Sequence, residues 1–265
     1  FEEATADGAA PAAEGADGQS EYDVFVQAFK ELLCQSQIFV REVNDGERSV
    51  VSMRDIARAA RVFKWFLTYY SKLRGVASLA VSDDRDGAMR MHITAEMRPH
   101  IRSAVILTLG FCYHSRLNRD QRWGYRKRLC ETWKRMRADN PAVDWLKLDS
   151  ANELSEMLTQ TQHEFVNQME LGEGIALNEA LRENLFMLLV SVMNQIPILL
   201  IGKPGCSKSL AMGVLQNNLN GATSNKEFFK SMPAVEVFAY QCSPLSTPGA
   251  ILSAFHSARQ SNLGH

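Results

Sequence analysis

A short glycine-rich loop that ends in lysine and serine holds the side chains best suited to chemistry. It reads Gly202-Lys203-Pro204-Gly205-Cys206-Ser207-Lys208-Ser209. Glycine lets the backbone turn sharply so that several N–H groups can face one phosphate, while a lysine neutralises phosphate charge and a hydroxyl binds Mg²⁺. We therefore predict a site for ATP and Mg²⁺, with Lys208 at the phosphates and Ser209 as the magnesium ligand. The residues predicted to bind the nucleotide are Gly202, Lys203, Pro204, Gly205, Cys206, Ser207, Lys208, Ser209 and Leu210.

The loop departs from the standard phosphate-binding pattern at one position. Ser207 stands where that pattern has the glycine before the lysine. The alternative interpretation is a Gly-Pro turn that binds nothing. The surroundings favour binding, because Lys208 begins an amphipathic helical pattern, and the helix dipole disfavours a lysine at a helix N-terminus unless an anion is present.

The elements around the loop are predicted from hydrophobic spacing. Helices are expected over about 181–193 and 208–219, and the continuous apolar runs 196–201 and 235–240 are typical of buried strands. A strand, a helix and a second strand in this order indicate a βαβ unit, which implies a parallel sheet. Residues 151–265 are therefore predicted to form an α/β domain.

The first half of the chain has a different character. Residues 22–150 show the spacing of amphipathic helices and no convincing strand alternation, so this part is predicted to be all-α. Residues 1–21 are rich in alanine and glycine, carry only acidic charges and contain almost no large apolar side chain. Because such a segment buries too little apolar surface to offset its ordering entropy, we expect a disordered linker.

Composition argues against several classes of protein. A net charge of −1 disfavours a protein that binds polyanions with its whole surface. The cysteines are widely spaced and include no Cys-x-x-Cys pair, so free thiols are expected rather than a disulfide framework or a zinc site. The most apolar stretch, 185–201, contains Asn194, Gln195 and Pro197 and is too short to be a good membrane span.

A basic segment over 116–137 also contains Trp123, Tyr125 and Trp133. Basic and aromatic side chains together can bind single-stranded nucleic acid through phosphate contacts and stacking. The same pattern is more often a solvated helix face with its aromatic side chains turned inward. We favour the second interpretation and do not expect nucleic acid as a partner.

The sequence after the loop lacks one component of hydrolysis. An ATP-hydrolysing site of this kind needs an acidic residue at the end of another strand, to hold magnesium and to orient water. No apolar run after Ser209 ends in Asp-Glu. We therefore expect no catalytic residue in this chain and no hydrolysis by the chain alone.

Three segments carry a resemblance to a known family, residues 176–186, 196–209 and 239–248. They resemble the mysterin family of giant RING-type AAA+ ubiquitin ligases, in which the loop also reads Gly-Lys-Pro-Gly-x-Ser-Lys-Ser, so that Ser207 is expected. Upstream segments are similar to the helical lid of the preceding AAA+ module in that family, and they are residues 41–45, 51–56, 62–66 and 109–114.

The resemblance implies both a fold and a function. It implies an α/β chain in which the all-α lid of one AAA+ module, residues 22–150, is followed by the start of a P-loop AAA+ parallel-sheet domain, residues 151–265. It implies ATP and Mg²⁺ as cofactors, ATPase activity in the AAA+ core, and ubiquitin transfer by RING regions that this chain does not contain. The implied partners are adjacent AAA+ modules of the same chain and the ubiquitin machinery, in the cytosol and on lipid droplets.

Two alternatives stay open. One is a nucleotide-binding module that does not hydrolyse ATP and uses it as a structural clamp. The other is a helical interaction scaffold whose loop is inert.

Arg54 is a further candidate nucleotide-binding residue. It lies in Ser52-Met53-Arg54-Asp55, and the resemblance implies that this arginine approaches the phosphates of a nucleotide in the preceding module. The alternative is a capping box, in which Ser52 and Asp55 close the start of a helix while Arg54 projects separately.

If Arg54 contacts phosphates, Arg54→Ala is expected to weaken nucleotide binding and slow turnover by the intact protein, because a charged hydrogen bond is lost. Affinity and turnover equal to those of the parent would contradict the phosphate role.

Overall fold

Helices make up most of the regular structure among the residues that the structure describes, which are 20–46, 51–74, 81–83, 89–91 and 93–261. The structure is a computed structural model, and the chain divides into two compact units, Phe1–Thr161 and Gln162–His265. The division falls within a helix. The predicted domain boundary between residues 150 and 151 stays a prediction, and nearly all of the predicted linker, 1–21, lies outside the described residues.

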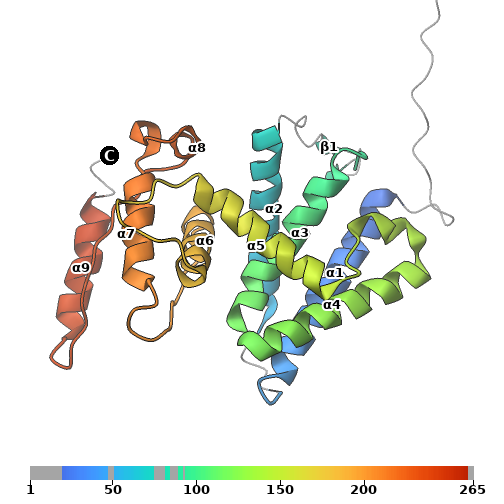
Figure 1. The fold of residues 1–265 in the computed structure, drawn as a ribbon, viewed down its shortest axis with the longest axis horizontal. Coiled ribbons are helices and arrows are strands. Elements are labelled where there is room, and N and C mark those ends of the chain that lie inside the picture. Colours follow the sequence, from blue (N-terminus) through green and yellow to red (C-terminus); the bar gives the residue numbers. More distant parts are fainter. Residues whose placement is uncertain (1–19, 47–50, 75–80, 84–88, 92, 262–265) are drawn as a thin grey trace, which may run out of the picture. The chain divides into compact units, whose positions relative to one another are not determined.

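The first unit is built around long helices (Figure 1). Its elements are α1 (Glu21–Glu42), α2 (Met53–Arg74), β1 (Val81–Asp83), β2 (Met89–Met91), α3 (Arg98–Cys112), the 3₁₀ helix η1 (His114–Arg116), α4 (Arg119–Asp139) and the 3₁₀ helix η2 (Pro141–Leu146). Helix α5 (Ala151–Asn167) follows and crosses the division between the units. Strands β1 and β2 pair antiparallel, an element that the helical spacing did not predict.

Local sequence sets where these helices begin. The Ser20 hydroxyl caps α1 by accepting a hydrogen bond from the Asp23 N–H at 3.2 Å. Asn118 and Gln121 form a capping box at the start of α4. Helix α1 then packs on α4, and α2 packs on α3. The largest fully buried side chains of this unit are Trp133, Tyr113, Tyr125, Phe66, Leu32, Ile101, Leu107, Leu109 and Leu146.

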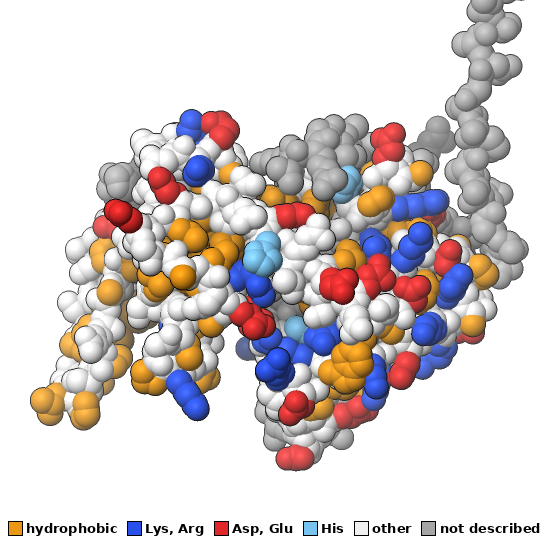
Figure 2. Space-filling view, in the orientation of Figure 1, with side chains coloured by type: hydrophobic (Ala, Val, Ile, Leu, Met, Phe, Trp, Pro, Cys, Tyr) orange, Lys and Arg blue, Asp and Glu red, His pale blue; other side chains and the backbone are white. Residues whose placement is uncertain are grey.

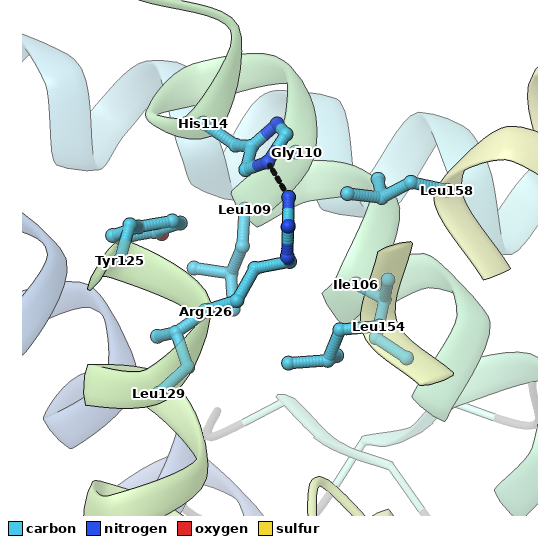
Figure 3. A pocket seen from close by; sticks show the side chains of 9 residues that line it. All are labelled: Ile106, Leu109, Gly110, His114, Tyr125, Arg126, Leu129, Leu154 and Leu158. Carbon is cyan, nitrogen blue, oxygen red and sulfur yellow. Dashed lines mark hydrogen bonds between the residues drawn. The ribbon is translucent and has the colours of Figure 1, made fainter. Parts of the chain in front are cut away.

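A small cavity lies inside the first unit (Figure 3). It is lined by Ile106, Leu109, Gly110, His114, Tyr125, Arg126, Leu129, Leu154 and Leu158. Its volume of about 10 Å³ suits about one water molecule. The cavity is therefore a packing feature and cannot hold a nucleotide.

One polar contact crosses this cavity. Arg126 Nη1 lies 3.0 Å from His114 Nε2. Burial, together with the charges of Arg122 and Arg126, lowers the pKa of His114 to about 3. The imidazole is therefore neutral at physiological pH, and its Nε2 accepts the hydrogen bond that the guanidinium donates.

The second unit is organised by two packed helices. Its elements after α5 are α6 (Glu179–Met193), α7 (Lys208–Asn218), the 3₁₀ helix η3 (Gly221–Thr223), α8 (Glu227–Lys230) and α9 (Pro248–Ser261). Helix α6 packs on α7 (Figure 1). Phe165 of α5 contacts Phe186 and Phe228 edge-on, at ring-centroid distances of 5.9 and 6.2 Å. The best-buried apolar side chains of α6 and α7 are Leu181, Leu185, Phe186, Leu188, Leu189, Val190, Ala211, Val214 and Leu215.

The predicted α/β fold with a parallel sheet is wrong. Residues 196–201 and 235–240 form neither a helix nor a strand, and the described part of the chain contains no parallel pair. The second unit is therefore helical. Within the described residues of this unit, Asn220 and Ala234 form one antiparallel bridge. Beside it, Val235 N–H donates a hydrogen bond to Leu219 O at 2.8 Å.

The two apolar runs do not form strands because hydrophobic spacing in the sequence does not determine which backbone groups pair. In the first apolar run, Ile196 is buried, whereas Leu199 is 81% exposed and Ile201 is 87% exposed. Extended backbone places successive side chains on opposite sides, so one side of this run faces the unit and the other faces outward. A strand exists only when its N–H and C=O groups pair with a neighbour. These two runs do not pair with each other, and neither belongs to a described sheet.

A buried asparagine ties α7 to the segment after α5. Asn218 is 4% exposed and accepts a hydrogen bond from Glu170 N–H at 2.7 Å. Its Nδ2 donates to Glu170 O at 3.0 Å and to Val214 O at 2.8 Å. The side chain therefore satisfies both backbone groups of one residue far away in the sequence.

Replacing Asn218 by alanine leaves the N–H and C=O of Glu170 without this partner. Each hydrogen bond contributes about 0.5–1.5 kcal/mol, so we expect the loss of the two bonds to Glu170 in Asn218→Ala to lower the free energy of unfolding of the second unit by about 1–3 kcal/mol. Urea unfolding followed by circular dichroism measures this loss. The exposed neighbour Asn217 is the matched control, and Asn217→Ala is expected to change stability by less than about 0.5 kcal/mol. Equal effects of the two changes would contradict this role.

His114 is expected to make the stability of the first unit depend on pH. Its pKa falls from 6.5 in the unfolded chain to about 3 in the folded unit. The unfolded chain therefore binds more protons between these pH values, and stability decreases as pH falls from about 6.5, by at most about 1.4 kcal/mol per pH unit for one proton.

His114→Gln keeps an acceptor for Arg126 and removes this titration, so the decrease between pH 7 and 5 is expected to become smaller. Urea unfolding at pH 8, where the histidine is neutral in both states, isolates any change in packing. An unchanged pH dependence would rule out His114 as its source.

Candidate phosphate-binding loop

The loop between the first apolar run and α7 turns through two left-handed residues. Gly205 has φ +84° and Ser207 has φ +57°. Glycine adopts this region without penalty, but a side chain there costs about 1–2 kcal/mol. The position at which the sequence departs from the standard motif is thus the strained one.

The start of α7 has unused hydrogen-bond donors. Ser207 is the residue that precedes α7, but its side chain makes no capping hydrogen bond. Ala211 N–H donates to Ser207 O at 2.9 Å and makes the first bond of the helix. The N–H groups of Lys208, Ser209 and Leu210 therefore have no partner within α7, and they lie at the positive end of its dipole.

Lys208 folds back over the loop. Its Nζ donates to Gly202 O at 2.8 Å and to Lys203 O at 2.9 Å. Among the ion pairs found in the described residues, none involves Lys208. The ammonium group is therefore held at the loop without an acidic side chain to neutralise it.

Gly202 allows the loop to close on itself. A Cβ atom at this position would lie 3.3 Å from Cys206 Sγ and 3.8 Å from Lys208 Nζ. The thiol contact would be tight, so a larger residue would push the Cys206 side chain aside.

Asn184 of α6 also holds the loop, a contact that the sequence did not predict. Its Nδ2 donates to Cys206 O at 2.8 Å. It belongs to the segment 176–186 that carries part of the family resemblance. Its spacing in α6 gives no signal for a contact with the loop, which depends on how α6 packs on α7.

The predicted nucleotide-binding residues of the loop are brought together in different ways. Hydrogen bonds and close packing join Gly202, Lys203, Cys206 and Lys208. Ser209 and Leu210 are exposed on the first turn of α7. Nucleotide binding by these residues stays a prediction.

Arg54 lies in the first unit and is exposed in the first turn of α2. Ser52 Oγ accepts a hydrogen bond from Arg54 N–H at 3.3 Å, and the Asp55 carboxylate accepts one from Ser52 N–H at 2.8 Å. The helix start is therefore closed by Ser52 and Asp55, as in the capping alternative. This geometry leaves the Arg54 side chain outside the cap, and its phosphate role stays a prediction.

Asp55 also connects α2 to η1. Its carboxylate lies 2.6 Å from Arg116 Nη2 and 3.2 Å from Arg58 Nη1. Burial raises the pKa of Asp55, but the Ser52 N–H and the two arginines lower it by a larger amount, so the net shift of this pKa is downward. This carboxylate is ionised at neutral pH and has a structural role.

The basic segment forms α4, a surface helix. Its arginines pair with acidic side chains of α1 and η2, and the pairs are Arg128–Glu42, Arg135–Glu31 and Arg137–Asp144. Trp133 and Tyr125 are buried, whereas Trp123 is 41% exposed. Basic and acidic side chains are interspersed on the first unit in the face that Figure 2 shows. Three basic side chains of α4 thus make contacts within the unit.

The described residues hold no grouping of three or more His, Cys, Asp or Glu side chains suited to a metal ion, and the five cysteines are free. No described helix is both long and apolar enough to cross a bilayer.

Comparison with known proteins gives the family. Residues 174–264 match a family model described as the RNF213 AAA domain. The E3 ubiquitin-protein ligase RNF213 of Homo sapiens is 32% identical over 234 residues, which are 88% of this chain and 4% of the human protein. The protein of the same name from Mus musculus is 30% identical over 225 residues, 85% of this chain and 4% of its own length.

A third relative, E3 ubiquitin-protein ligase rnf213-beta of Danio rerio, is 28% identical over 226 residues, again 85% of this chain and 4% of the relative. The chain thus spans about 4% of the length of these relatives. The AAA-domain match lies within the second unit, and the similarity to RNF213 proteins extends through most of both units. The resemblance predicted from the sequence is therefore confirmed, and the chain belongs to the RNF213, or mysterin, family.

Proposed function

We propose that the loop of residues 202–210 binds the phosphates of ATP with Mg²⁺. One observation carries the proposal: the N-terminus of α7 has unused N–H donors beside the ammonium group of Lys208, which has no acidic partner among the described ion pairs. Donors at a helix N-terminus and a nearby cation together favour an anion. Phosphate is the anion that this combination of loop, lysine and hydroxyl is suited to bind.

Each residue of the site has a separate role in this proposal. Backbone N–H groups of the loop hold phosphate oxygens, and Lys208 neutralises their charge. Ser209, exposed on the first turn of α7, supplies the hydroxyl that ligates Mg²⁺. Bound ATP supplies the phosphoanhydride bond that an AAA module can hydrolyse when acidic residues are also present.

For the whole protein we propose an E3 ubiquitin ligase with an AAA ATPase core, to which this chain belongs. Support comes from the names of the relatives, which are E3 ubiquitin-protein ligases, and from the AAA-domain match. Adjacent AAA modules and the ubiquitin machinery are the proposed partners. The cytosol and the surface of lipid droplets are the proposed locations, on the basis of the resemblance alone. No residue of this chain is proposed to transfer ubiquitin.

The self-contact of Lys208 favours one second candidate. Because its ammonium group already bonds to two carbonyls of the loop, the loop could hold its own lysine and serve only a structural purpose within a helical scaffold. Binding measurements on a lysine variant separate the two functions.

Lys208→Ala is expected to weaken Mg·ATP binding by the full chain at least about tenfold, since a hydrogen bond to a charged group contributes about 1.5–3 kcal/mol. Isothermal titration calorimetry measures the affinity. Lys203→Ala removes a second cation of the same loop, whose backbone carbonyl and not its side chain contacts Lys208, and a smaller effect is expected. No binding by the parent chain would favour the scaffold, and equal effects of the two changes would argue against the role of Lys208.

A further inference from the structure

We propose that Asn184 is a positioning residue of the phosphate loop, and that its amide orients the peptide bond between Cys206 and Ser207 for anion binding. The inference rests on the proposed function of the loop. Asn184 lies in α6, outside the loop, and it acts on the ligand only through the backbone of the loop.

Asn184 acts from a rigid position. It lies in α6 between residues that anchor this helix in the core: Leu181 and Leu185 are both 0% exposed. Helix α6 packs on α7, the helix that follows the loop. The hydrogen bond from Asn184 Nδ2 to Cys206 O is 2.8 Å long. The loop is thus attached at its centre to a helix that cannot easily move.

This hydrogen bond also fixes an N–H group. In a trans peptide the C=O and the following N–H point in opposite directions, and the described residues contain no cis peptide. When Asn184 holds Cys206 O toward α6, the Ser207 N–H must point away from α6. That N–H donates to no described atom, so it is available to a ligand.

The next peptide is held in the same manner. Ser207 O accepts the hydrogen bond from Ala211 N–H at 2.9 Å, which directs the Lys208 N–H away from the body of α7. Between these two peptides, Ser207 has the left-handed φ of +57°. A left-handed residue next to a right-handed one makes successive N–H groups converge, which is the geometry of a backbone anion site.

The strain at Ser207 explains why such a support is needed. The left-handed conformation is disfavoured for a residue with a side chain, whereas the hydrogen bond that Asn184 makes is favourable. Without Asn184, rotation of the peptide between Cys206 and Ser207 relieves the strain and turns the Ser207 N–H away from the ligand side.

Ser207→Gly distinguishes a positioning role of Asn184 from a purely structural one. Glycine at 207 has no penalty in the left-handed region, so Ser207→Gly should make Asn184 dispensable. We expect Asn184→Ala to weaken binding of Mg·ADP about fivefold, the equivalent of about 1 kcal/mol. The double change Asn184→Ala with Ser207→Gly should return the affinity to within about twofold of Ser207→Gly alone.

The experiment measures Mg·ADP affinity by isothermal titration calorimetry with the full chain, and thermal unfolding of each variant checks its folding. Asn184→Asp has the same size and replaces the amide donor by a carboxylate beside Cys206 O, so it should weaken binding more than Asn184→Ala. Asn217→Ala, an exposed change on α7, is the control and should bind like the parent.

The outcomes distinguish a failure of the inference alone from a failure of the proposed function. Weaker binding by both Asn184 variants, with rescue by Ser207→Gly, supports the inference. If the parent binds Mg·ADP and the Asn184 variants bind equally well, the inference fails and the proposed function stands. Weaker binding without rescue also overturns it, because Asn184 then acts through general packing. If the parent binds no Mg·ADP, both the proposed function and the inference fail.

Discussion

The packing of α6 on α7 is the constraint on which the candidate site depends. Leu185 and Leu189 of α6, together with Val214 and Leu215 of α7, are nearly inaccessible to solvent. Their burial stabilises the contact between the two helices, because the hydrophobic contribution grows with the apolar area removed from water. Only with this pair in place does the amide of Asn184 reach the loop, and only then is the start of α7 held against a second element.

Basic side chains have different partners on α4 of the first unit and at the loop. On α4, arginines lie within hydrogen-bond distance of carboxylates from α1 and η2. At the loop, Lys208 instead rests on two backbone carbonyls, next to helical N–H groups that have no partner in α7. Backbone carbonyls hold an ammonium group in place but do not neutralise it. The N-terminus of α7 therefore combines helical N–H donors with an ammonium group that none of the described ion pairs neutralises.

Apolar side chains are distributed unevenly between the two units. The large ones of the first unit lie mostly in its interior, whereas the second unit has several at its surface (Figure 2). They include Leu199, Ile201, Leu245 and Phe255. The apolar run over 196–201 was predicted to be a buried strand of a parallel sheet, and it is neither paired nor fully buried. This run ends at Ile201, directly before Gly202, where the loop begins.

Local information in the sequence was enough to locate the loop, the start of α7 at Lys208 and most helix positions, because turns, caps and amphipathic spacing involve residues close together in the chain. The tertiary structure decided the contacts that join distant segments. Asn184 lies 22 residues before Cys206, and Glu170 lies 48 residues before Asn218. It also decided that the two apolar runs do not form a sheet. Such pairings depend on how helices pack and which backbone groups meet, and hydrophobic periodicity reports only which side of an element is apolar.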